Sequence, residues 1–83
     1  MLLKIYTLNG IKYQGEVKSL NAKTAVGEIT VLDGHRPLIS ILKKGEIKVV
    51  DKNNQTSSVT ISSGFLEVGA QNSVNILAKS DNI

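Results

Sequence analysis

Apolar and polar residues alternate along most of the chain, with the period of two that β-strands require. The alternation is clearest over residues 47–49, 59–62 and 74–78. β-Branched residues are frequent in these segments, which favours strands over helices. No window shows the i, i+3, i+4, i+7 apolar spacing of an amphipathic helix. The pattern therefore predicts an all-β chain.

Turn-forming residues separate the alternating segments. Asn9-Gly10 lies between two apolar stretches, where it predicts a hairpin with a type I′ turn and a positive φ at both residues. Asp33-Gly34 marks a second turn. Short strands between closely spaced turns are typical of an antiparallel sandwich or barrel. We therefore expect one antiparallel β domain.

The size and composition of the chain restrict its class. Its 83 residues make one domain with a thin core. It has no cysteine, which excludes disulfides and thiolate metal sites. No apolar run approaches the roughly 18 residues that span a bilayer, and Lys4 comes too early for the apolar region of a signal peptide. We therefore expect a soluble, unprocessed chain, which is compatible with attachment to a membrane complex.

The sequence offers no arrangement of residues for catalysis. A catalytic triad needs a base within reach of a nucleophile, but His35 is the only histidine, and the serines cluster elsewhere, around residues 57–63. One histidine without cysteine cannot supply a zinc site from imidazole and thiolate donors. No glycine-rich loop precedes a helix to hold a phosphate. We expect no catalytic residue, no cofactor and no metal.

The net charge of +3 raises nucleic-acid binding through the N-terminal half as an alternative function. Residues 1–26 carry most of the excess of lysine over acidic residues. Tyr6 and Tyr13 lie near Lys4 and Lys12, where they could stack bases. Cross-strand packing over a hairpin explains the same tyrosines without a ligand. The lysines also stand singly between apolar residues, as on the solvent-facing side of strands.

His35, Arg36 and Pro37 are the only histidine, arginine and proline of the chain, and they are consecutive. A lone histidine beside a turn is by default a solvated loop residue. Proline, however, fixes φ and lacks an N–H group, and it pushes the residue before it into an extended conformation. Gly34, Arg36 and Pro37 therefore predict a rigid corner that presents side chains to a partner.

The same stretch is similar to a known family signature. Residues 27–38, GEITVLDGHRPL, strongly resemble the hallmark of the epsilon subunit of F-type ATP synthase. The resemblance covers essentially the whole chain. Further matches follow in the family's order at residues 13–15 (YQG), 44–49 (KGEIKV), 63–68 (SGFLEV) and 72–78 (NSVNILA).

This resemblance implies an all-β fold, an antiparallel β-sandwich of two five-stranded sheets over residues 1–80, with residues 81–83 as a tail. It also implies a non-catalytic central-stalk subunit that turns with the rotor and links the gamma subunit to the membrane c-ring. In that role the domain supports the coupling of ion transport to ATP synthesis. It binds no cofactor and no nucleic acid, and it meets the membrane only through the complex. We expect the complex on the ATP-producing face of an energy-transducing membrane, the cytoplasmic side of a bacterial inner membrane.

The resemblance also assigns contact residues. His35 matches the family histidine that faces gamma, and Thr7 and Ser40 align with further positions near gamma. Glu28 matches the loop glutamate that approaches the c-ring, where polar or basic loop residues could pair with it. Typical family members continue into a C-terminal helical hairpin, which can inhibit ATP hydrolysis and in some members binds ATP. Since this sequence ends after its last expected strand, we expect no C-terminal helical domain and neither of these functions.

Overall fold

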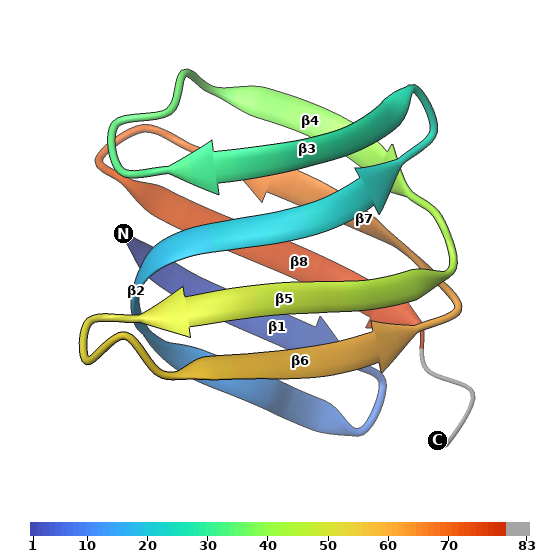
Figure 1. Cartoon of the computed structure of the whole chain (residues 1–83). Helices are drawn as coiled ribbons and strands as arrows, with labels where there is room; N and C mark the ends of the chain where they lie inside the picture. The colour runs from blue at the N-terminus through green and yellow to red at the C-terminus, as the bar shows by residue number, and fades with distance from the viewer. Residues whose placement is uncertain (80–83) are drawn as a thin grey trace.

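The computed structural model describes residues 1–79, which form eight β-strands and no helix (Figure 1). The all-β prediction is therefore confirmed for this part of the chain. Residue 80 and the expected tail, residues 81–83, lie outside the described residues. The strands are β1 (Leu2–Thr7), β2 (Gly10–Thr24), β3 (Gly27–Leu32), β4 (Leu38–Leu42), β5 (Gly45–Asp51), β6 (Thr56–Ile61), β7 (Ser63–Val68) and β8 (Ser73–Lys79).

β2 is the longest strand, with 15 residues, and it belongs to both layers of the sandwich. Its first half, from Gly10 to Glu16, pairs antiparallel with β1. Its second half pairs with β3 on one side and with β5 on the other. The register with β5 shifts between Val17 and Ser19, and a β-bulge of this kind bends a strand. β2 therefore curves from one layer into the other, as the arc at the left of Figure 1 shows.

The remaining strands fill two layers around β2. One layer runs β4-β7-β8-β1 and ends on the first half of β2; the other runs β3, the second half of β2, β5 and β6. The predicted sandwich is confirmed, but its layers hold five and four strands in one continuous sheet, because β2 is shared. β1 and β8 pair in parallel, because the turn before β8 lies beside the start of β1. There the N–H of Leu2 donates to the carbonyl of Asn72 (3.0 Å).

The predicted Asn9-Gly10 hairpin joins β1 to β2, but its turn is of another type. Gly10 has a positive φ of 111°, whereas Asn9 does not, and a type I′ turn needs a positive φ at both central residues. The hydroxyl of Thr7 closes the turn instead. It accepts a hydrogen bond from the N–H of Asn9 (3.1 Å) and donates to the carbonyl of Gly10 (3.2 Å).

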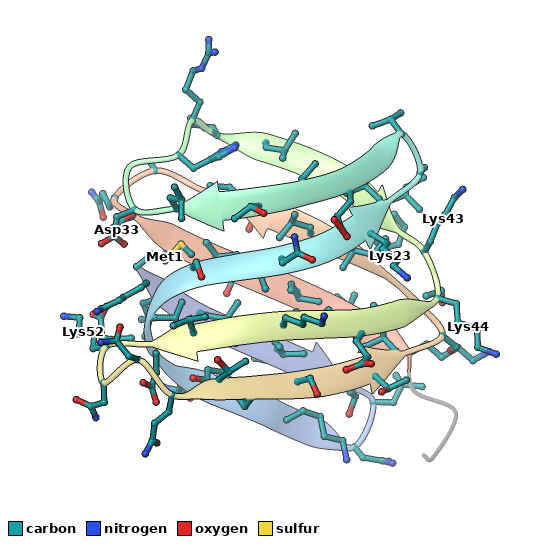
Figure 2. All side chains as sticks on the ribbon, viewed as in Figure 1. Met1, Lys23, Asp33, Lys43, Lys44 and Lys52 are labelled. Atoms are coloured by element: carbon teal, nitrogen blue, oxygen red, sulfur yellow. The ribbon has the colours of Figure 1, made fainter. Side chains whose placement is uncertain are left out.

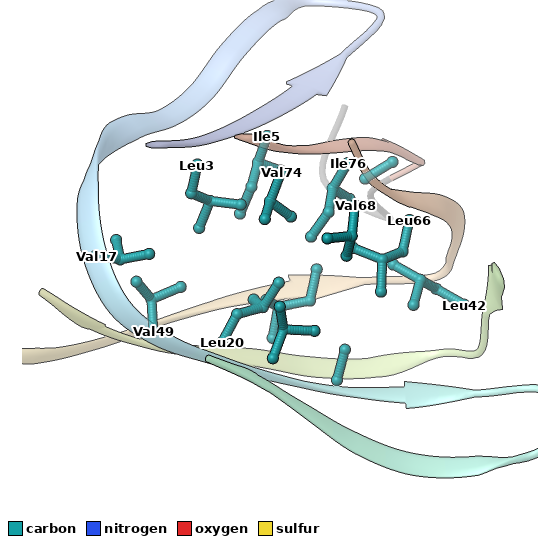
Figure 3. Packing of buried hydrophobic residues seen from close by; sticks show 14 of the residues in the cluster. Leu3, Ile5, Val17, Leu20, Leu42, Val49, Leu66, Val68, Val74 and Ile76 are labelled. Atoms are coloured by element: carbon teal, nitrogen blue, oxygen red, sulfur yellow. The ribbon is translucent and has the colours of Figure 1, made fainter. Parts of the chain in front are cut away.

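Aliphatic side chains fill the space between the layers and alternate with outward-facing residues along the strands (Figure 3). Leu66 and Ile76, which the pattern places in the core, are both 0% exposed. The prediction for these two residues is therefore confirmed. The buried apolar residues are Met1, Leu3, Ile5, Val17, Leu20, Ala22, Val31, Leu42, Ile47, Val49, Ile61, Leu66, Val68, Val74, Ile76 and Ala78.

The turns lie at two opposite ends of the sandwich (Figure 2). One end, which we call the lysine end, holds the β1–β2, β2–β3 and β4–β5 turns together with Lys79, the last residue of β8. There the N–H of Lys43 donates to the carbonyl of Lys23 (2.8 Å), and the N–H of Ser62 donates to the carbonyl of Lys79 (2.7 Å). The opposite end, the Met1 end, holds Met1 and the β3–β4, β5–β6 and β7–β8 turns.

Truncation of a fully buried core residue should remove much of the domain's stability. We expect Leu66→Ala or Ile76→Ala to lower the free energy of unfolding by about 2–5 kcal/mol, because a cavity remains where the side chain was. Ile39→Ala is the matched control, since the Ile39 side chain is 76% exposed. Urea unfolding of the three variants measures the difference. Equal losses at the buried and exposed positions would contradict the core described above.

Candidate interaction surfaces

The stretch DGHRPL forms an exposed corner between β3 and β4, at the Met1 end. Gly34 takes a positive φ of 78°, which glycine adopts without strain. The N–H of His35 donates back to the carbonyl of Leu32 (3.1 Å) and closes the turn. Residues 33–37 are all exposed. Residues 33–37 therefore form an exposed turn, and both the rigidity of this corner and its role in binding a partner stay predictions.

A charged contact fixes this corner to the rest of the domain. The carboxylate of Asp33 accepts hydrogen bonds from the N-terminal ammonium of Met1 (2.5 Å) and from the side-chain amide of Asn72 (3.3 Å). The ammonium also donates to the carbonyl of Val17 (3.0 Å), and the amide oxygen of Asn72 accepts from the N–H of Gly34 (3.0 Å). The hydrogen bond from the ammonium, followed by that from Asn72, lowers the pKa of the Asp33 carboxyl. Figure 2 shows Met1 and Asp33 together at this end.

The three residues expected to contact gamma do not share one surface. His35 lies at the Met1 end, where its Nδ1 donates to the carbonyl of Arg36 (2.7 Å). Thr7 is buried at the lysine end, and its hydroxyl is used within the β1–β2 turn. Ser40 is half-buried in β4, on the same side of the strand as the buried Leu42. A single partner that touched all three would have to reach along the length of the domain.

Two turns at the lysine end share a Thr-x-x-Gly sequence, TLNG and TAVG, which a search for glycine turns alone does not reveal. The hydroxyl of Thr24 repeats the contacts of Thr7: it accepts from the N–H of Val26 (3.2 Å) and donates to the carbonyl of Gly27 (2.6 Å). Each turn carries an apolar residue outward. Leu8 is 88% exposed and Val26 is 92% exposed. These apolar side chains therefore project from hydrogen-bonded turns.

Glu28 is exposed at the start of β3, near the lysine end and away from the corner. It stands opposite Lys23 of β2 in the strand register. Both residues line a polar groove of about 430 Å³ on the outer face of their layer, together with Lys44, Glu46 and Lys48. This outer face therefore offers charges of both signs to a partner.

The outer face of the other layer is apolar toward the lysine end. Ile41, Phe65 and Leu77 stand opposite one another on β4, β7 and β8, and each is 56–58% exposed. Leu8 joins them in lining an open groove of about 320 Å³. We call Ile41, Phe65 and Leu77 the apolar stripe. Apolar side chains gathered on an exposed face mark a site of interaction with another molecule.

The structure removes the main support for nucleic-acid binding. Tyr13, one of two tyrosines available for base stacking, packs against the hydrophobic core. Burial, and then the charge of Asp51, raises the pKa of its hydroxyl. The N-terminal lysines are also dispersed: Lys18 donates to the side chain of Asn54 (2.5 Å) at the Met1 end, whereas Lys23 lies near the lysine end. The N-terminal lysines are therefore divided between the two ends of the domain.

Residues 1–79 contain no group of three or more His, Cys, Asp or Glu side chains placed to hold a metal ion. No helix long and apolar enough to cross a membrane occurs in the same part of the chain. The charged side chains described above lie on the outer faces and the turns.

The Asp33 contact should make stability depend on pH in the acid range. Because folding lowers the pKa of the Asp33 carboxyl, the carboxylate stabilises the folded state above its unfolded pKa of roughly 3.9, and this contribution is lost as the pH falls through the lower folded pKa. We expect a higher urea midpoint for the wild type than for Asp33→Asn at neutral pH, and convergence of the two midpoints below about pH 4. Both proteins are purified with a free N-terminal amino group. A gap that persists unchanged at the lowest pH would contradict this contact.

Comparisons with known proteins agree with the fold. A family model for the β-sandwich domain of the ATP synthase delta/epsilon chain matches residues 1–81. Two curated ATP synthase epsilon chains, from Endomicrobium trichonymphae and Anoxybacillus flavithermus, are 36% and 38% identical over 77 residues. These matches cover 93% of this chain but 54% and 56% of the relatives. The chain thus spans about half the length of the curated relatives it matches.

Solved structures give the same result. A chain of the Euglena gracilis mitochondrial ATP synthase, in a structure of OSCP, F1 and the c-ring, superposes with a TM-score of 0.88 and 25% identity, over 94% of this chain and 49% of that one. A chain of the Tetrahymena thermophila mitochondrial ATP synthase central stalk and c-ring has a TM-score of 0.80 over 96% of this chain and 63% of that one; at 17% identity it shows the fold alone. Because the family match runs through all eight described strands, this chain belongs to the ATP synthase delta/epsilon chain β-sandwich domain family.

Proposed function

We propose that this domain is a non-catalytic central-stalk subunit of an F-type ATP synthase, which links the gamma subunit to the c-ring and supports the coupling of ion transport to ATP synthesis. Family membership and the relatives named ATP synthase epsilon chain support this role. The structural observation that carries it is the apolar stripe, because large apolar side chains aligned on one outer face favour a protein partner. The role requires no chemistry and no cofactor from this chain.

The apolar stripe is the surface that we assign to gamma. Stable interfaces place apolar side chains at their centre and polar side chains at their rim, and Lys79 lies in the same groove beside the stripe. Ser40 directly precedes Ile41, so this expected gamma contact adjoins the stripe in sequence, although its own side chain is half-buried. Thr7 lies farther away, in the β1–β2 turn.

The corner at the Met1 end provides a second, smaller contact in this proposal. Pro37 fixes its own φ and favours an extended Arg36, and Gly34 takes the positive φ of the turn without strain. The bond between Asp33 and the N-terminal ammonium fixes the corner to the domain. An exposed His35 on such a corner could contact gamma without a large ordering cost. We propose this role for His35 as a contact separate from the stripe.

The lysine end faces the c-ring in this proposal, with Glu28 as its contact residue. An exposed ion pair contributes only about 0–1 kcal/mol, so Glu28 would orient the domain on the ring more than hold it there. The complex as a whole is peripheral on an energy-transducing membrane, and we propose the cytoplasmic side of a bacterial inner membrane as its location.

A pull-down tests this role. The tagged chain, recovered from detergent-solubilised membranes of the source organism, should retain gamma and c subunits, which mass spectrometry identifies. The double change Phe65→Ser and Leu77→Ser should lower the recovery of gamma about tenfold or more, because both side chains lose apolar contact area. In the same assay, the His35→Ala and Glu28→Ala variants should fold normally. His35→Ala should lower the recovery of gamma, and Glu28→Ala that of the c subunit, by about two- to fivefold.

The matched control is the double change Ser58→Ala and Thr60→Ala, since both residues are exposed on β6 in the opposite layer. It should leave the recovery of gamma unchanged. Full recovery with the Phe65 and Leu77 double variant would contradict the assignment of the stripe. Recovery of nucleic acid, or of no partner, with the wild-type chain would contradict the central-stalk role itself.

A further inference from the structure

We propose that the lysine end binds the anionic phospholipid headgroups of the membrane around the c-ring. The inference rests on the proposed function, which turns this end toward a membrane-embedded ring. It goes beyond that function, because the resemblance implies membrane contact only through other subunits. Two independent features of the lysine end carry it: the distribution of charge and the exposure of apolar side chains.

An excess of positive charge lies at this end. Its basic and acidic side chains are Lys12, Lys23, Lys43, Lys44, Lys79, Glu28 and Glu46. The corresponding side chains of the Met1 end are Lys18, Arg36, Lys52, Glu16, Asp33 and Asp51. The second set is balanced, and the N-terminal ammonium adds one positive charge at that end. Five lysines against two glutamates give the first set an excess of +3, and Lys4, Lys48 and Glu67 lie between the two ends. Figure 2 shows Lys23, Lys43 and Lys44 at one end, opposite Asp33 and Lys52.

The two most exposed large apolar residues of the described chain also lie at this end. Val26 is 92% exposed in the β2–β3 turn, and Leu8 is 88% exposed in the β1–β2 turn. Each turn is closed by a threonine hydroxyl, from Thr24 and Thr7 respectively. The apolar tips are therefore presented on preformed turns, and binding would require little further ordering of the backbone.

Lysines around apolar tips suit the interface of an anionic membrane. The lysines attract negatively charged headgroups within a Debye length of the surface. Apolar side chains such as Val26 and Leu8 gain by entering the boundary between headgroups and acyl chains. The combination matches a lipid surface better than a nucleic acid, since aliphatic tips offer no face on which a base can stack.

Vesicle flotation with the full chain tests the proposal. The probes are vesicles of phosphatidylcholine alone and vesicles of phosphatidylcholine mixed with phosphatidylglycerol. We expect the wild type to float with the anionic vesicles and to bind the neutral ones at least about tenfold more weakly, with a loss of binding at high salt. The double change Lys43→Gln and Lys44→Gln should weaken binding to the anionic vesicles about tenfold or more.

Two comparisons make the result specific. The charge-matched control, Lys18→Gln with Lys52→Gln, alters the Met1 end and should leave vesicle binding unchanged. The double change Val26→Ser and Leu8→Ser should weaken vesicle binding several-fold. A DNA oligonucleotide serves as a second probe, and its binding should be the same for the double variant and the wild type. Circular dichroism confirms that each variant is folded.

Three results would overturn the proposal: equal binding to neutral and anionic vesicles, equal losses from the two lysine pairs, or tighter binding to the oligonucleotide than to the vesicles. The flotation assay contains neither gamma nor the c-ring, so its outcome is separable from that of the pull-down. Failed flotation with a successful pull-down would reject lipid binding and leave the stalk role intact. Lysine-dependent flotation with a failed pull-down would reject the stalk role and leave a lipid-binding domain.

Discussion

The architecture depends on β2, the one strand that passes from the first layer of the sandwich into the second. Its first half is hydrogen-bonded to β1, and its second half lies between β3 and β5. Val17 and Leu20, on either side of the bulge, are both 0% exposed, so the strand bends around the core with these side chains on its inner side (Figure 3). Main-chain hydrogen bonds therefore tie the two layers together, and the aliphatic core fills the space that the bend encloses.

Because β2 fixes which side of each layer meets the core, it also fixes the surfaces that remain outside. One outer face carries the apolar stripe, and the other carries a polar groove with charges of both signs. One end concentrates lysines and apolar turn residues, and the other holds a corner anchored through Asp33 to the N-terminal ammonium. A small domain thus presents four chemically distinct surfaces. Such a division suits the connecting role proposed above.

Local features of this molecule could be predicted from its sequence, whereas long-range ones could not. The alternation of residues 74–78 specifies which side chains of β8 share a face, and the structure confirms it. Gly34 permits a left-handed turn and Pro37 restricts its own φ, so a turn at this corner is predictable as well. The apolar stripe depends instead on the register among strands distant in sequence, and Phe65 taken alone looks like a core residue. The bond between Asp33 and the chain's own amino terminus has no sequence pattern.

In the proposed role, the outer face around Phe65 meets the gamma subunit of an ATP synthase. A photo-reactive benzoylphenylalanine at position 65 tests it most directly, because it keeps the aromatic ring at a side chain that is 56% exposed. On illumination of intact membranes, the account predicts a crosslink to gamma from position 65 and none from position 60, which lies on the outer face of the opposite layer. A crosslink to gamma from position 60 with none from position 65, or a crosslink from position 65 to a protein outside the stalk, would contradict the account.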